Sequence, residues 1–130
     1  RAALKLQVLW ELKAGRLARL LVEPGKASDA HSPITHAEIA AGHLLVFDLG
    51  YFDLDRLRAV DTGGAKFISR LQPGTEVQDS GGKPLGLLAW LRRQEGGLVD
   101  RAVKLGAQAQ LPCRLVAVRV PQEVASRRKQ

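Results

Sequence analysis

The 130-residue sequence predicts an α/β fold built from three successive pieces. In the first piece apolar and polar residues alternate, which is typical of strands with one buried face. The second is a continuous apolar run followed by a capped amphipathic segment and another strand, which is typical of a strand–helix–strand unit with parallel strands. The third is rich in turn residues and then in strands. At 130 residues the chain fits one domain, and its character changes after residue 72.

Composition narrows the class of protein. Hydrophobic residues make up 45% and charged residues 25% of the chain, which are ordinary values for a globular domain. No stretch approaches the about 18 apolar residues of a membrane span, and the start forms no apolar block typical of a signal peptide. Cys113 is the only cysteine, so we expect no internal disulfide and a reducing cytoplasm. A start at Arg1 without methionine and a basic end are interpreted as the ends of a fragment.

The net charge of +7 is unevenly distributed. Residues 1–100 contain 13 Lys or Arg and 12 Asp or Glu. Residues 101–130 contain 7 Lys or Arg, and Glu123 is their only acid. A basic segment can attract polyanions such as DNA by releasing counterions. The alternative is a solvated surface without a partner, and the charge alone leaves both possibilities open.

Residues 4–12 and 16–22 predict an antiparallel hairpin that ends at Pro24-Gly25. Apolar residues recur at every second position of the first strand, so one of its faces is expected to be buried. These residues are Leu4, Leu6, Val8 and Trp10. We interpret Trp10 as a hydrophobic anchor.

Residues 26–43 are mixed, with a short helix possible over residues 36–41. The sequence places His31, His36 and His43 here, which raises the hypothesis of a zinc site. Their spacing matches no common zinc pattern, and Cys113 is far away in the sequence. The sequence therefore disfavours zinc.

Residues 44–71 predict a strand, a helix and a second strand. Leu44–Phe47 is a continuous apolar run, typical of a strand covered on both faces. Asp53 is a suitable N-cap for a helix that ends at Gly63-Gly64, and residues 65–71 form the second strand. The apolar residues of the helix recur at helical spacing. They are Leu54, Leu57 and Val60. The two strands should be parallel, with a right-handed crossover.

The remainder of the chain changes character after residue 72. A turn-rich segment leads to a short amphipathic helix over residues 85–93, with Trp90 as a second anchor. Strands are expected over residues 102–108 and 111–120. Pro121 ends the last strand, and residues 123–128 begin a helix.

Asp48 carries a carboxylate directly after the strand that is expected to be buried. In open α/β sheets, functional sites lie at the carboxyl ends of strands. Gly50 allows the backbone to turn sharply beside it. One interpretation is an N-cap or a turn acid. Because Asp53 already caps the helix, Asp48 is left without a structural task, which favours a metal ligand.

The segment LLVFDLGYFDLDRLRAVDTGGAKFISRL, residues 44–71, resembles the region around the second catalytic aspartate in DDE transposases of bacterial insertion sequences, of the IS-four type. In that family a strand ends in Asp-x-Gly-Tyr-Phe, which residues 48–52 match, and a later strand ends in or near Ser-Arg-Leu, which residues 69–71 match. The hairpin is similar to the family's second and third strands. Residues 111–130 resemble its β-rich insertion, so the resemblance covers nearly the whole chain.

The resemblance implies a partial RNase H-like catalytic core over residues 1–72 and a truncated β-rich insertion over residues 73–130. In such a core three carboxylates hold two Mg²⁺ or Mn²⁺ ions, which stabilise the attacking and leaving oxygens while DNA is cut and joined. Asp48 matches the second acid. The first strand with its acid, and the glutamate, are expected outside this chain, so the chain alone is expected to be inactive.

The resemblance also implies a partner, DNA at the element ends and at the target. It further implies self-association of the full-length protein, and a bacterial cytoplasmic location at the nucleoid. Tyr51 could stack on DNA bases or pack in the core, and Arg70 could bind a phosphate or simply be a surface residue. Phosphate contacts are also expected from the basic tail, Arg127, Arg128 and Lys129. Two alternatives remain, a non-enzymatic DNA-binding module and a remnant without function.

Overall fold

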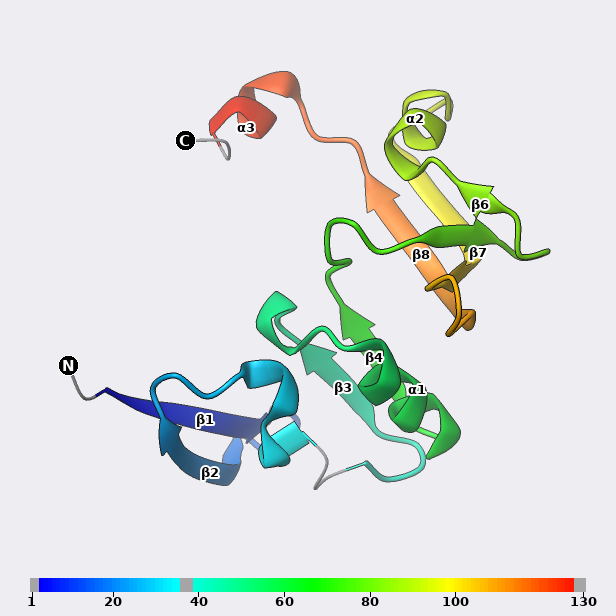
Figure 1. Ribbon diagram of the computed structural model, residues 1–130. Coiled ribbons are helices and arrows are strands. Elements are labelled where there is room, and N and C mark those ends of the chain that lie inside the picture. Colours follow the sequence, from blue (N-terminus) through cyan, green and yellow to red (C-terminus); the bar gives the residue numbers. More distant parts are fainter. Residues whose placement is uncertain (1–2, 36–38, 128–130) are drawn as a thin grey trace. The chain divides into compact units, whose positions relative to one another are not determined.

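The computed structural model describes residues 3–35 and 39–127 (Figure 1). The chain divides into two compact units, unit 1 over Arg1–Pro73 and unit 2 over Gly74–Gln130. Both contain strands and helices, so the protein is of the mixed α/β class. None of the described helices is long and apolar enough to cross a membrane.

Unit 1 begins with an antiparallel hairpin of strands β1 (Leu4–Glu11) and β2 (Arg16–Pro24), as the sequence predicts. Gly15 lies in the turn with φ of 62°, a left-handed conformation that glycine adopts without a steric penalty. Leu9 pairs with Arg19 and Trp10 with Leu17, so the register shifts between them and Ala18 forms a bulge in β2. The hairpin forms a two-stranded sheet of its own.

The buried face of β1 is opposite to the one that the sequence predicts. Gln7 is 1% exposed, whereas Leu6 and Val8 are 63% and 52% exposed. Their cross-strand partners Val22 and Leu20 are exposed as well. None of the side chains in the described part of unit 1 covers this apolar face, which is why it remains in solvent.

Two 3₁₀ turns, η1 (Asp29–His31) and η2 (Pro33–Thr35), pack against the polar face of the hairpin instead. Ser32 and Ile34 are buried at this contact. Trp10 is 52% exposed, so its interpretation as a hydrophobic anchor is wrong. The sequence allows a short helix over residues 36–41, of which residues 36–38 lie outside the described residues. Residues 39–41 are described and are not helical.

The second part of unit 1 consists of β3 (Leu44–Phe47), helix α1 (Leu54–Thr62) and β4 (Lys66–Ser69). The two strands pair in parallel, as predicted. The Asp53 carboxylate caps α1 by accepting a hydrogen bond of 2.9 Å from the Arg56 backbone N–H. The helix ends at Gly63, and Gly64 follows with φ of 76°.

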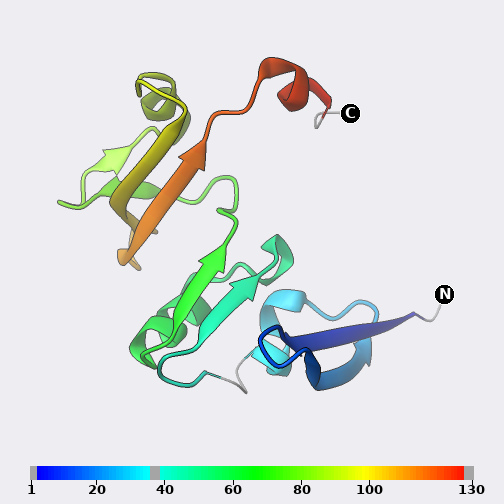
Figure 2. The same cartoon turned by 180° about the vertical axis from the view of Figure 1, so that it is seen from behind.

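Helix α1 covers one face of the β3–β4 pair, lying in front of it in Figure 1 and behind it in Figure 2. Leu57 and Val60 of α1 are completely buried there. On the other face Val46 is 63% and Ile68 is 57% exposed. The expectation that β3 is covered on both faces is therefore wrong for the residues described, because nothing among them packs on the second face.

Unit 2 is a four-stranded antiparallel sheet in the order β6-β5-β7-β8. Its strands are β5 (Val77–Asp79), β6 (Pro84–Leu85), β7 (Leu98–Leu105) and β8 (Leu111–Val118). Helix α2 (Leu87–Arg92) connects β6 to β7, and α3 (Gln122–Arg127) follows β8. The core of this sheet is formed by Val77, Val103, Leu105 and Leu111. Trp90 is half-buried on α2.

Candidate functional site

Asp48 lies directly after β3 and is exposed. Its backbone is extended, with φ of −72° and ψ of 161°, and a 3₁₀ turn, η3 (Leu49–Tyr51), begins after it. The Asp48 side chain makes no capping hydrogen bond to this turn. Only its backbone carbonyl is engaged there, accepting a hydrogen bond of 3.0 Å from the Tyr51 N–H. The carboxylate is thus held at the strand end without an N-cap role.

Arg70 lies at the same edge of the sheet as Asp48. Phe47 and Ser69 form the last pair between β3 and β4, and Asp48 and Arg70 are the residues that follow them. Both are exposed. An acid and a base at neighbouring strand ends can hold a cation and a phosphate next to each other.

Tyr51 is hydrogen-bonded to the hairpin. Its hydroxyl donates a hydrogen bond to Gln7 Oε1, and the ring is half-buried. Burial of the phenol raises the pKa of Tyr51, and the nearby negative charge of Asp29 raises it further. The hydroxyl is therefore engaged inside unit 1.

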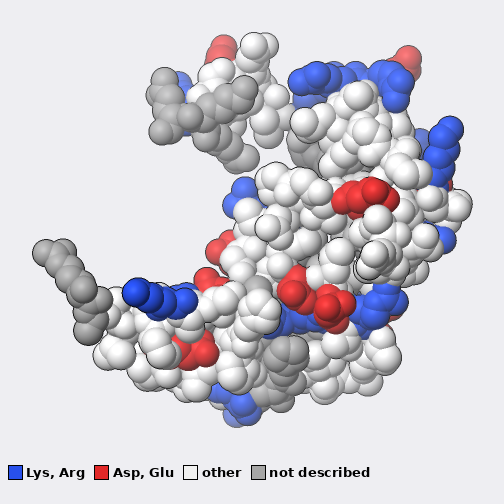
Figure 3. Space-filling model, viewed as in Figure 1, with Lys and Arg blue, Asp and Glu red and all other residues white. Residues whose placement is uncertain are grey.

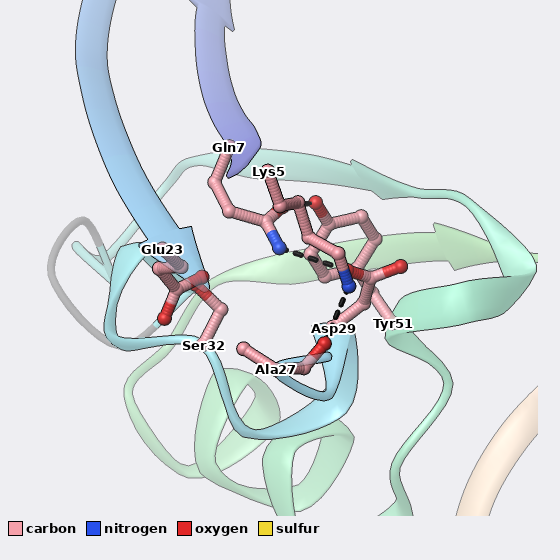
Figure 4. Close-up of polar contacts among 7 residues, drawn as sticks. All are labelled: Lys5, Gln7, Glu23, Ala27, Asp29, Ser32 and Tyr51. Atoms are coloured by element: carbon pink, nitrogen blue, oxygen red, sulfur yellow. Dashed lines mark hydrogen bonds and ion pairs between the residues drawn. The ribbon is translucent and has the colours of Figure 1, made fainter. Parts of the chain in front are cut away.

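Four polar side chains from the hairpin, η1 and η3 meet at this point, as Figure 4 shows. We call them the hairpin cluster: Lys5, Gln7, Asp29 and Tyr51. Asp29 Oδ1 accepts hydrogen bonds from Lys5 Nζ at 2.9 Å and from Gln7 Nε2 at 2.8 Å. These hydrogen bonds hold the pKa of Asp29 below its usual value. Sequence reasoning missed Gln7 and Asp29, because no motif links residues so far apart in the chain.

Basic side chains gather in unit 2. Figure 3 shows Lys and Arg side chains over α2, whose last turn carries Arg92 and whose C-cap is Arg93. Arg92 and Arg119 line an open hollow of about 740 Å³ together with the start of α3. Arg119 Nη2 donates to the Gln94 carbonyl at 3.3 Å. Arg127 is exposed in the last turn of α3, whereas Arg128 and Lys129 lie outside the described residues.

Metal ligands are sparse in the part of the chain that the structure describes. No group of three or more His, Cys, Asp or Glu residues there could hold a metal ion, and His36 lies outside that part. Asp48 fits the role of one hard oxygen ligand, since its carboxylate is exposed and does not cap η3. It cannot complete a metal site with the described residues alone.

Similarity to known proteins identifies the family. The profile described as the transposase DDE domain matches residues 1–129. The chain is 38% identical over 72 residues to the transposase for insertion sequence element IS231E of Bacillus thuringiensis subsp. finitimus, which covers 55% of this chain and 15% of that protein. It is 35% identical over 77 residues to the IS231F transposase of subsp. israelensis, which covers 58% and 16%.

The matched segment thus spans about 15% of the length of these curated relatives. No solved structure matches the chain. The family profile extends over nearly all of the chain, including the Asp48 motif and both units. The chain therefore belongs to the transposase DDE domain family, among the transposases of insertion sequences.

Proposed function

We propose that this chain is part of a transposase that cuts and joins DNA by two-metal phosphodiester chemistry, with Asp48 as one of the metal-binding carboxylates. The observation that carries the proposal is the position of Asp48. It is exposed at the carboxyl end of a parallel strand and makes no capping hydrogen bond, within a chain of the transposase DDE domain family. The hairpin and the β3–α1–β4 unit are consistent with part of an RNase H-like core, and unit 2 with a β-rich insertion.

Mg²⁺ is the metal that suits a carboxylate and water ligand set best. Two such ions, when bound, would stabilise the attacking and leaving oxygens of the phosphodiester. The protein's own contribution here is to hold the Asp48 carboxylate at the strand end and to keep Arg70 at the same edge for a phosphate. One carboxylate cannot position two ions, so we expect this chain to be inactive alone.

DNA would be the substrate, at the element ends and at the target, in the nucleoid of a bacterial cell. Phosphate groups of the DNA would be contacted by Arg127, Arg128 and Lys129. A DNA base would be contacted by Tyr51. Self-association would belong to the full-length protein. A second candidate, a DNA-binding module without catalysis, is favoured by one observation, the hollow of unit 2 lined by Arg92 and Arg119.

A Mn²⁺ titration of the purified chain, followed by NMR, tests the proposed role of Asp48. Paramagnetic broadening should be strongest for the amide signals at the end of β3 in the wild type, and should disappear in Asp48→Asn. Asp55→Asn is the matched control, because Asp55 is an exposed acid in the first turn of α1. Equal broadening in Asp48→Asn and wild type would contradict the assignment.

A plasmid-nicking assay with Mg²⁺ tests the expected inactivity. The purified chain should leave supercoiled DNA intact, even where the chain binds that DNA. Nicking that Asp48→Ala abolishes would show that the chain is a complete nuclease and not a part of one. DNA binding without any effect of Asp48 on metal binding would favour the DNA-binding module.

A further inference from the structure

The backbone of Asp48 is joined to the turn that follows it. The Asp48 carbonyl accepts from the Tyr51 N–H, and the Leu49 carbonyl accepts from the Phe52 N–H, both at 3.0 Å. The Asp48 side chain itself makes no capping hydrogen bond to η3. The contacts that fix η3 therefore also restrain the Asp48 backbone, from which the carboxylate projects.

The hairpin cluster holds one side of η3. The Tyr51 hydroxyl donates to Gln7 Oε1, and the Gln7 amide donates to Asp29 Oδ1 at 2.8 Å. Gln7 is only 1% exposed, so its amide is held in one orientation by partners at both ends. Lys5 Nζ, which also donates to the Ala27 carbonyl, fixes Asp29 from the other side (Figure 4).

Direct packing brings η1 and η3 together at the same place. A Cβ atom on Gly50 would lie 3.0 Å from Asp29 Oδ2, which is closer than about nine in ten real Cβ contacts. Gly50 does not have a positive φ, so glycine is not needed here for its backbone conformation. Its lack of a side chain instead leaves room for the Asp29 carboxylate. The turn after Asp48 and the carboxylate of Asp29 are thus in contact.

Helix α1 holds the other side of the turn. The side chain of Arg56 is 2% exposed, and its Nη1 donates to the Tyr51 carbonyl at 3.4 Å. Burial lowers the pKa of Arg56, and Asp53 and Tyr51 oppose this change. The turn is therefore clamped between α1 and the hairpin, through the backbone of Tyr51 on one side and its hydroxyl on the other.

We propose that Gln7 and Asp29 are positioning residues for Asp48: through Tyr51 and the close contact at Gly50 they fix η3, and with it the direction of the Asp48 carboxylate. This inference rests on the proposed role of Asp48 as a metal ligand. It adds two residues that lie outside the Asp-x-Gly-Tyr-Phe segment. In this proposal neither residue would contact the metal or the DNA directly. A purely structural role would stabilise unit 1 without affecting Asp48.

The test compares the wild-type 130-residue chain with two variants of the hairpin cluster, Asp29→Asn and Tyr51→Phe. Both substitutions keep the shape of the side chain, and Tyr51→Phe removes only the hydroxyl that donates to Gln7. Glu11→Gln is the control, because it disrupts an ion pair with Arg16 on the exposed edge of the same hairpin. Urea unfolding identifies any variant that is not folded under the conditions of measurement.

The first readout needs no metal. NMR couplings that report the Asp48 χ1 angle should show one dominant rotamer in wild type and Glu11→Gln, and averaging over rotamers in Asp29→Asn and Tyr51→Phe. The second readout is affinity for Mn²⁺ alone. It should fall by a factor of about three in both cluster variants, less than the roughly 10–100-fold cost of removing a direct outer-shell partner.

The two readouts separate the two proposals. If both cluster variants are folded and keep the wild-type Asp48 rotamer and Mn²⁺ affinity, the positioning role is overturned, while the metal role stands provided that Asp48→Asn still abolishes Mn²⁺ binding. If Asp48→Asn binds Mn²⁺ like wild type, the metal role fails, and the rotamer measurement still decides whether the cluster positions Asp48.

Discussion

Leu6 is 63% exposed, and its neighbour in β1, Gln7, is 1% exposed. Successive side chains of a strand point to opposite faces, so the apolar face of the hairpin lies in solvent and the polar face lies inside unit 1. Gln7 is held there by Asp29 and Tyr51, which satisfy its amide. These hydrogen bonds offset the cost of removing the amide from water.

Substitutions on the two sides of unit 1 should therefore have very different effects on the free energy of unfolding. Leu6→Thr places a β-branched side chain in a strand and removes no buried side chain, so we expect a change within about 0.5 kcal/mol. Leu57→Ala removes a side chain that is 0% exposed under β3 and β4, and should cost about 2–5 kcal/mol. Urea unfolding followed by circular dichroism measures both.

A destabilisation by Leu6→Thr as large as that by Leu57→Ala would contradict the exposed position of Leu6. Val8→Thr provides a second measurement on the same face, since Val8 is 52% exposed. A change within about 0.5 kcal/mol in both hairpin variants would show that this face is solvated in the isolated chain.

The parts of the fold that the sequence predicts are those with local causes. The cap of α1 by Asp53, the end of the helix at Gly63 and the apolar run of β3 each depend on residues within a few positions of one another. In contrast, β5 and β6 are three and two residues long and lie in a turn-rich segment. They are strands because β5 pairs with β7, a pairing that no local pattern reveals.

The buried face of β1 and the hairpin cluster could not be predicted for a related reason. Alternation of apolar and polar residues identifies the two faces of a strand. It predicts correctly which face is buried only if another part of the protein covers the apolar face. Gln7 and Asp29 are 22 residues apart, and Tyr51 is 44 residues from Gln7. The strand-end position of Asp48 was predictable from the apolar run before it, whereas its neighbours in space were not.

The stability of unit 1 should depend on the ionisation of Asp29. Hydrogen bonds from Lys5 and Gln7 lower the pKa of this carboxyl in the folded state. A lowered folded-state pKa gives stabilisation that is complete above the unfolded-state value, about 4, and disappears as the pH falls through the folded-state value. The difference in unfolding free energy between wild type and Asp29→Asn should be constant from about pH 7 to about pH 5 and shrink below about pH 4.

Urea unfolding at a series of pH values measures this difference. The same series on Asp55→Asn, an exposed acid of α1, serves as the control. A difference for Asp29→Asn that stays constant down to the lowest pH, or grows there, would show that the carboxylate is not stabilised by its two donors.

Gly50 and Asp29 should show strong energetic coupling. Gly50→Ala places a methyl group about 3.0 Å from Asp29 Oδ2, so η3 or the carboxylate has to move, and we expect a destabilisation of about 1–3 kcal/mol. In an Asp29→Ala background the obstructing oxygen is absent, and the same substitution should cost less. A double-mutant cycle on unfolding free energies measures the coupling, expected at about 0.5–3 kcal/mol for residues that touch. Additive effects would rule out the close approach of these two residues.

The basic end of the chain should govern the salt dependence of DNA binding. Residues 101–130 carry 7 Lys or Arg and one acid, and three of the basic residues are Arg127, Arg128 and Lys129. Replacing these three by Gln should reduce the slope of log affinity against log salt by about 0.9 for each phosphate that the tail no longer neutralises. Fluorescence anisotropy with a labelled duplex at several salt concentrations gives this slope.

A control with the same change of net charge decides whether the position of the charges matters. Lys13, Arg16 and Arg19 lie in the hairpin of unit 1, and replacing all three by Gln also removes three positive charges. If the tail binds phosphates, the tail variant flattens the slope and the hairpin variant leaves it nearly unchanged. If both variants flatten it equally, DNA is attracted by net charge alone. An unchanged slope in the tail variant would mean that these three side chains remain solvated in the complex.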